Sequence, residues 1–143
     1  MKRIVIAWSF LLGVEATPAC DGLVIERAWL RQPPPASEVA AAYFEARNPS
    51  DHEIVIQRVA SPDFSGVMLH ATRMVEGRVE MRPQGDIVLA PGARFSVVPG
   101  GSHVMLSGAH QRLDANASLR LELHCASGTP LAVALPVRRD APP

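Results

Sequence analysis

Apolar and polar residues alternate over much of this chain, in short runs separated by Pro, Gly, Asn and Asp. The clearest run covers residues 118–125. A period of two is typical of a β-strand that has one face in the core and the other in water. The pattern places Leu119, Leu121, Leu123 and Cys125 on the core face and Arg120, Glu122 and His124 on the wet face.

Other β-prone runs follow one another along the chain, and helical periodicity is scarce. A Glu76-Gly77 pair between two such runs predicts a hairpin that reverses near Gly77. The absence of an internal repeat and the presence of seven to nine strands predict an all-β fold, a single antiparallel β-sandwich. The predicted strands cover residues 23–30, 40–47, 53–59, the hairpin 67–81, 87–89, 94–98, 103–106, 118–125 and 131–137.

The N-terminus has the layout of a secretory signal peptide: basic residues, an apolar run over 4–14 and then small residues. We therefore expect residues 1–19 to be a signal peptide, cleaved after Ala16 or Ala19, and residues 20–143 to form the domain. The apolar run is shorter than the roughly 20 residues that span a bilayer, so we expect no transmembrane segment in the mature chain. The expected protein is periplasmic and soluble, with a lipid anchor at Cys20 as the less favoured alternative.

The charge balance and the missing motifs exclude several functions. The 143 residues contain 14 basic and 14 acidic side chains, and this zero net charge argues against a nucleic-acid partner. The single lysine, Lys2, excludes a P-loop and Schiff-base chemistry from the body of the chain. Neither Gly-x-Ser-x-Gly nor His-Glu-x-x-His occurs. We expect a monomer that is not an enzyme.

Two cysteines, Cys20 and Cys125, remain after the predicted cleavage. Because exported proteins enter an oxidising compartment, a Cys20–Cys125 disulfide is expected. The alternative is that Cys125 is only a small buried apolar residue in its strand.

Methionine and histidine gather in one part of the chain. Every methionine of the expected mature chain lies between residues 68 and 105, as do His70 and His103. His103 and Met105 are two residues apart, so they share a face of a regular strand and can bind one ion. His70, Met81, His103 and Met105 then form a candidate metal site, and soft, neutral thioethers favour Cu(I). Met68 and Met74 are more typical of packing residues.

The spacing His70-x10-Met81-x21-His103-x-Met105 resembles the signature of the periplasmic copper chaperones that serve the dicopper A centre of cytochrome c oxidase. The resemblance covers residues 23 to 137 and implies a cupredoxin-like sandwich of Greek-key type that carries one Cu(I) on those four ligands. It implies a copper-accepting partner such as cytochrome c oxidase subunit II or another copper chaperone. Met74 and Met68 lie close enough in sequence to be auxiliary ligands, with Met74 as the named candidate, but the signature includes neither. No His/Met-rich tail follows Val137, which leaves a Cu(II) site in doubt.

Two other classes of protein remain to be weighed. A blue-copper electron carrier needs His and Met soon after its cysteine, and neither follows Cys125. A metal-free exported sandwich that serves adhesion or interaction would use its methionines as core residues. Burial separates the hypotheses, because the copper interpretation fails if Met81 and Met105 pack inward.

Overall fold

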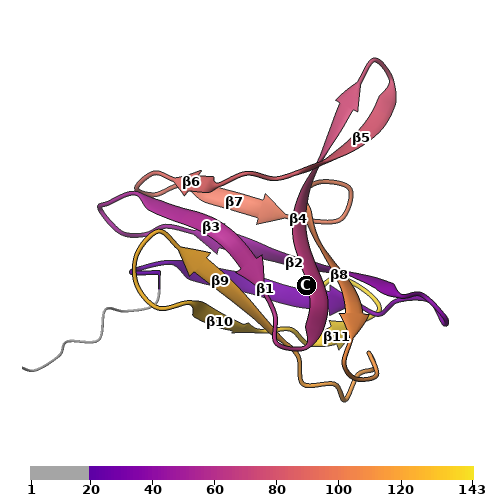
Figure 1. Cartoon of the computed structure of the whole chain (residues 1–143). Coiled ribbons are helices and arrows are strands. Elements are labelled where there is room, and N and C mark those ends of the chain that lie inside the picture. Colours follow the sequence, from indigo (N-terminus) through magenta and orange to yellow (C-terminus); the bar gives the residue numbers. More distant parts are fainter. Residues whose placement is uncertain (1–19) are drawn as a thin grey trace, which may run out of the picture.

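The computed structural model describes residues 20–143, and the predicted signal peptide with its cleavage point lies outside the described residues. Two β-sheets pack face to face in a sandwich, as the alternation predicted, and the sandwich is cupredoxin-like, as the resemblance implied. Among residues 20–143 there is no helix with the length and apolar character needed to cross a membrane. The elements of the described residues are β-strands, as the alternating pattern predicted (Figure 1).

The larger sheet has the strand order β11-β1-β2-β8-β4-β5, and β7 also pairs with β2. Its strands are β1 (Val24–Arg31), β2 (Val39–Arg47), β4 (Phe64–Val75), β5 (Arg78–Pro83), β7 (Arg94–Val97), β8 (His103–Ala109) and β11 (Val137–Arg138). The smaller sheet has the order β10-β9-β3-β6. Its strands are β3 (Ile54–Ala60), β6 (Ile87–Leu89), β9 (Arg120–Cys125) and β10 (Leu131–Ala134).

The strand count and the last predicted strand need correction. Eleven strands lie within the described part of the chain, more than the seven to nine expected. The predicted strand 131–137 is divided at Pro136, which has no N–H to donate to a ladder. On one side of this proline β10 pairs with β9, and on the other side β11 pairs with β1 in parallel. The chain thus crosses between the sheets here, and one pairing departs from the antiparallel rule.

The core lies between the sheets and follows the predicted alternation. Leu119, Leu121 and Leu123 are buried as expected, and the last two have no exposed surface. Facing them, the larger sheet contributes a row of inward residues that crosses four neighbouring strands. That row consists of Leu30, Ala42, Val104 and Leu69, each no more than 8% exposed. Residues next to these in sequence therefore point to the outer face of the larger sheet.

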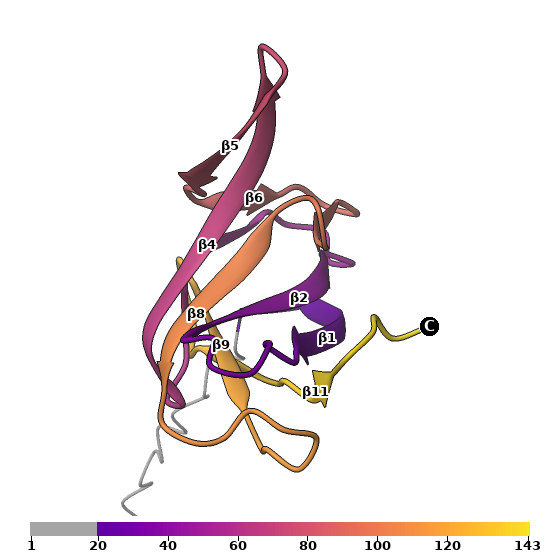
Figure 2. The ribbon, with the colours of Figure 1, turned by 90° about the vertical axis from the view of Figure 1, so that its right-hand side faces the viewer.

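The β4–β5 hairpin projects beyond the rest of the domain, which both views in Figures 1 and 2 make clear. It reverses at Glu76 and Gly77, where the sequence predicted the turn, with φ angles of 49° and 75°. Positive φ at both central residues is the geometry of the two-residue turn that matches the twist of paired strands. Because β5 pairs only with β4 in the described sheet, this hairpin forms the sheet's edge.

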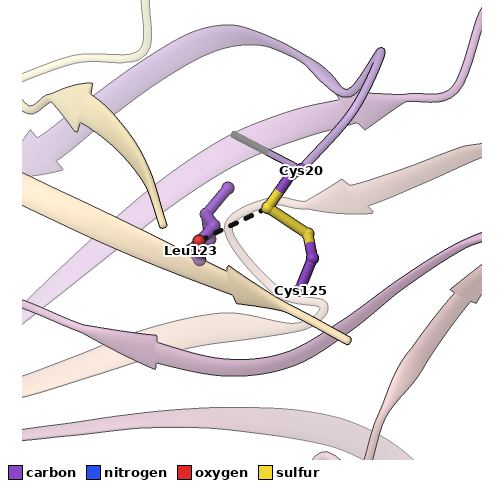
Figure 3. The surroundings of a disulfide bond; sticks show 3 residues. All are labelled: Cys20, Leu123 and Cys125. Carbon is purple, nitrogen blue, oxygen red and sulfur yellow. Dashed lines mark hydrogen bonds between the residues drawn. A yellow bond between two sulfur atoms is a disulfide. The ribbon is translucent and has the colours of Figure 1, made fainter. Parts of the chain in front are cut away.

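The predicted disulfide is present and joins Cys20 to Cys125 at the end of β9, 105 residues apart in sequence (Figure 3). Cys20 is 1% exposed and belongs to the hydrophobic core. Its sulfur also lies 3.4 Å from the carbonyl oxygen of Leu123. The bond therefore fixes the first described residue of the domain against the smaller sheet.

Candidate metal site

Two histidines face each other on the outer side of the larger sheet. His70 of β4 and His103 of β8 are direct partners in the antiparallel ladder. Their ring centroids are 5.7 Å apart, and the rings are inclined by 51°. Both side chains are half-buried, whereas the adjacent Leu69 and Val104 point into the core. The sheet register thus brings together two imidazoles that are far apart in sequence, at a separation suited to sharing one ion.

A loop outside the sheet positions His103. Both β7 and β8 pair with β2, and residues 98–102 leave the sheet between them. Pro99 and Gly100 occupy the centre of a tight turn, in which the Gly101 N–H donates to the Val98 oxygen at 3.0 Å. Gly100 has φ 83°, so this position favours glycine. The loop returns the chain to the sheet at His103, the first residue of β8.

The backbone also orients the His103 ring. Its Nδ1 atom lies 3.2 Å from the Gly101 carbonyl oxygen. A carbonyl oxygen can only accept a hydrogen bond, so Nδ1 carries a proton, and in the neutral imidazole Nε2 then keeps its lone pair. An imidazole that donates through one nitrogen is the usual arrangement of a metal-binding histidine. His103 is thereby prepared to bind a metal ion through Nε2.

The His70 ring differs, because its Nδ1 atom is buried and has no hydrogen-bond partner among residues 20–143. Leaving a buried polar group unpaired costs about 1–3 kcal/mol. A bound water, ligand or ion is one way in which such a buried group is satisfied. The His70 ring therefore has an unmet bonding capacity beside the His103 ring.

The methionines lie on the same face as the two histidines. Met105 follows His103 by two residues in β8, and Met81 of β5 is opposite Thr72, two residues beyond His70 in β4. Residues that are directly opposed, or two apart in one strand, share a face of a sheet. We call this outer surface of β4, β5 and β8 the His/Met face. It carries His70, His103, Met68, Met74, Met81 and Met105.

The positions along the His/Met face separate near donors from distant ones. Met105 pairs with Met68, two residues from the His70–His103 pair along each strand and on the side away from the hairpin tip. Met81 is one position away on the hairpin side. Met74 is opposite Val79, one position further toward the tip. The structure therefore brings Met68 nearer to the histidines than Met74, the auxiliary candidate named from the sequence.

Exposure answers the question that separated the two sequence interpretations. Met81 is 64% exposed, so it does not pack into the core. Met105 is half-buried on the outer face, while its neighbours Val104 and Leu106 are fully buried on the inner face. Inward packing of both methionines would have ruled out the copper interpretation, and neither methionine packs inward.

The donor set limits which metal the face can hold. Within residues 20–143 no group of three or more His, Cys, Asp or Glu side chains is arranged to hold a metal ion. A site on the His/Met face must therefore add thioethers to its two imidazoles. Thioether sulfur is soft and uncharged, and it selects Cu(I) over zinc and over the hard cations.

An aromatic stack beside the site was not predicted from the sequence. The rings of Trp29 and Tyr43 lie 5.0 Å apart, and the Arg31 guanidinium lies 5.7 Å and 5.6 Å from their centroids. Both aromatic residues are outward in register yet under 7% exposed. Tyr43 follows Ala42, the partner of Val104, and so lies level with His103. The stack therefore lies on the outer face at the level of His103, and alternation gave no signal for it, because it predicts polar residues at outward positions.

Fold and site together define a cupredoxin-like β-sandwich with paired imidazoles and thioethers on the outer face of one sheet. The chain belongs to the LpqE-like family, whose model, described as "Putative lipoprotein LpqE-like", matches residues 23–137. A curated relative, "Putative lipoprotein Lxx21020" of Leifsonia xyli subsp. xyli (strain CTCB07), is 27% identical over 119 residues. That match covers 82% of this chain and 70% of the relative.

Two solved structures are also similar. The copper-bound PCuAC domain from PmoF2 has 26% sequence identity and a TM-score of 0.66, covering 87% of this chain and 97% of that one. The solution structure of CuI-DR1885 from Deinococcus radiodurans has 28% identity and a TM-score of 0.60, covering 90% of this chain and 84% of that one. Both similarities extend over nearly the whole described domain.

Proposed function

We propose that this protein is an exported copper chaperone that carries one Cu(I) on His70, Met81, His103 and Met105. The observation that carries the proposal is the His70–His103 pair, whose rings are 5.7 Å apart. One thioether lies a single ladder position away on each side, on the same face. Two imidazoles and two thioethers form a neutral donor set of the kind that suits Cu(I).

The comparisons support a copper-carrying role from a separate direction. The similar PmoF2 domain is described as copper-bound, and the similar DR1885 structure as a CuI form. The spacing of the four proposed ligands also resembles the signature of copper chaperones for cytochrome c oxidase. Sequence spacing, local geometry and structural likeness therefore favour the same cargo.

The site favours transfer by ligand exchange rather than chemistry on a substrate. Met81 is exposed on an edge hairpin, so an acceptor can approach the ion from that side without unfolding the domain. An incoming thiolate or imidazole forms a bond to Cu(I) as a thioether leaves. No electron is transferred, and the neutral thioethers need no proton to be released. The proposed protein is accordingly a carrier and not an enzyme.

The acceptor we propose is a copper site rich in thiolate or imidazole. Such ligands bind Cu(I) more strongly than thioethers, so transfer toward them is favourable. The dicopper A centre in cytochrome c oxidase subunit II fits this description, and so does a second copper chaperone, as the resemblance of the sequence implies.

The proposed location is the periplasm, reached through removal of the signal peptide at residues 1–19. The family description names a lipoprotein, and Cys20 is the residue that a lipid would modify. The Cys20 sulfur is already bonded to Cys125 and buried in the core. One sulfur cannot carry both bonds, so we propose a soluble exported protein without a lipid on Cys20.

The two competing functions have less support. A blue-copper carrier needs a cysteine thiolate as ligand, and both cysteines of the described chain form the disulfide. A metal-free interaction domain gives no reason for four methionines and two histidines on one outer face. We therefore retain Cu(I) carriage as the proposed function.

X-ray absorption on the exported protein loaded anaerobically with one equivalent of Cu(I) tests this ligand set. We expect both sulfur and imidazole nitrogen in the first shell around copper. Because the described domain has no free thiol, any sulfur signal would come from methionine. A first shell of nitrogen and oxygen only would contradict the proposed site.

A further inference from the structure

We propose that Met68 is a fifth Cu(I) donor, which replaces Met81 on the ion when Met81 dissociates from it as an acceptor approaches. The inference rests on the proposed function, because it concerns the same ion on the same face. It assigns a role to a methionine that lies outside the His70-x10-Met81-x21-His103-x-Met105 pattern. It also describes how copper is kept on the domain during the first step of transfer.

The sheet register places Met68 beside the proposed ligands. Met68 is the direct partner of Met105 across β4 and β8. Directly opposed residues of an antiparallel pair have Cβ atoms about 4.5–5.5 Å apart, well within reach of two long side chains. Met68 also precedes His70 by two residues, so both lie on the His/Met face. Of the two methionines of residues 20–143 outside the pattern, Met68 is closer than Met74 in register to this pair of imidazoles and to Met105.

The Met68 side chain is free to move onto the ion. It is 46% exposed, whereas the next residue in β4, Leu69, is 8% exposed and packs in the core. A packing role, which the sequence favoured, therefore does not account for its position. Methionine has three rotatable side-chain bonds and a polarizable sulfur, so it can change partners at little cost.

The topology divides the five donors into a fixed set and a detachable one. His70, His103, Met105 and Met68 belong to β4 and β8, and β8 is itself paired with β2 inside the sheet. Met81 belongs to β5, the edge strand of the projecting hairpin (Figure 2). An acceptor that approaches the hairpin therefore competes with Met81 first, while the four donors on β4 and β8 stay in place.

The exchange step balances without any co-reactant. The copper–sulfur bond to Met81 breaks as a copper–sulfur bond to Met68 forms, and copper remains Cu(I) throughout. Both thioethers are neutral, so no proton moves and the charge of the site does not change. Two arrangements result, which share His70, His103 and Met105 and differ in one sulfur ligand.

Met74 provides a matched control within the same strand. It lies on the His/Met face and is 69% exposed, so it is at least as accessible as Met68. However, Met74 is four residues beyond His70 in β4, where it is opposite Val79 of β5. It is thus too far along the hairpin to join the ion while His70 and His103 hold it.

A double-mutant cycle on the exported protein tests the substitution of one thioether for the other. Anaerobic competition with a chromophoric chelator gives the Cu(I) affinity of the parent, M68L, M81L and M68L/M81L, and of the control variants M74L and M74L/M81L. Leucine conserves volume and apolar character, so the fold is expected to persist, and circular dichroism checks it. We expect M68L alone to change the affinity less than about threefold, because Met81 remains available.

The double variant carries the decisive comparison. If Met68 replaces Met81, M68L/M81L loses at least about tenfold more affinity than the product of the two single losses, whereas M74L/M81L shows no such excess. Equal, multiplicative losses in both double variants would overturn the role of Met68 while leaving the copper function intact. A parent that fails to compete for Cu(I) would contradict the proposed function itself and this inference with it.

Discussion

Replacing His103 with alanine is expected to abolish tight Cu(I) binding while the domain stays folded. His103 contributes one of two imidazoles, and the Gly101 carbonyl holds its ring in the orientation that frees Nε2. Loss of an outer partner of a metal ligand already costs about 10–100-fold in affinity, so loss of the ligand itself should exceed that range. The side chain lies on the outer face, outside the buried core, and its removal leaves the neighbouring Val104 in place.

The matched control for this variant is His124→Ala. His124 also lies half-buried on a strand, but on β9 of the smaller sheet, where it contacts Arg58. Chelator competition should give parental Cu(I) affinity for this control and a loss for His103→Ala, with both circular dichroism spectra unchanged. Parental affinity in a folded His103→Ala variant would remove His103 from the ligand set.

Removing the disulfide is expected to destabilise the protein strongly without weakening Cu(I) binding by the folded form. The Cys20–Cys125 bond closes a loop of 105 residues. Loss of a native disulfide from a small exported domain typically costs about 2–5 kcal/mol. Denaturant unfolding of a Cys20→Ala/Cys125→Ala variant should therefore show a markedly lower midpoint than the oxidised parent. The bond anchors the smaller sheet, whereas the proposed ligands lie on β4, β5 and β8.

Thiol counting and the intact mass of the exported protein complete this test. Under denaturing, non-reducing conditions we expect no free thiol and no added lipid mass. The reduced parent should unfold near the midpoint of the double alanine variant, which separates loss of the bond from the effect of the substitutions. One free thiol together with a lipid on Cys20 would refute the disulfide, and an unchanged midpoint in the variant would refute its role in stability.

The regular parts of this fold are readable from the sequence because one face of each strand is buried. In β9 the inward leucines and the outward Arg120, Glu122 and His124 repeat with a period of two, and the structure confirms it. The turn was predictable from Gly77 between two β-prone runs, since glycine readily adopts positive φ, whereas the positive φ of Glu76 has no signal in its residue type. The Cys20–Cys125 bond followed from there being two cysteines in the expected mature chain.

Features that depend on long-range register were not predictable in the same way. The local sequence of residues 131–137 does not predict that β10 and β11 belong to different sheets, although Pro136 marks the break between them. The direct pairing of Met68 with Met105 depends on how β4 aligns with β8, which local sequence pattern does not determine. From the sequence, packing was favoured for both methionines and Met74 was the named auxiliary candidate, whereas the register places Met68 nearer to the histidines.

The aromatic stack illustrates a second limit. Trp29 and Tyr43 occupy outward positions, where alternation predicts polar residues, yet both are buried. They pack against each other, and Arg31 covers their rings. The exposed Arg31 guanidinium over the aromatic faces covers the two rings and keeps its own charge in contact with water. Such side-chain arrangements depend on neighbouring strands and so become visible only in the folded domain.

Anaerobic titration of the exported protein with Cu(I), in competition with a chromophoric chelator, tests the central claim most directly. Zinc and Cu(II) titrations of the same protein serve as controls for the selectivity of the thioethers. The account predicts that the protein withdraws one Cu(I) per chain from the chelator, and that zinc does not displace it. Failure to withdraw Cu(I), or binding of zinc at the same site with equal strength, would contradict the assignment of the His/Met face as a Cu(I) carrier site.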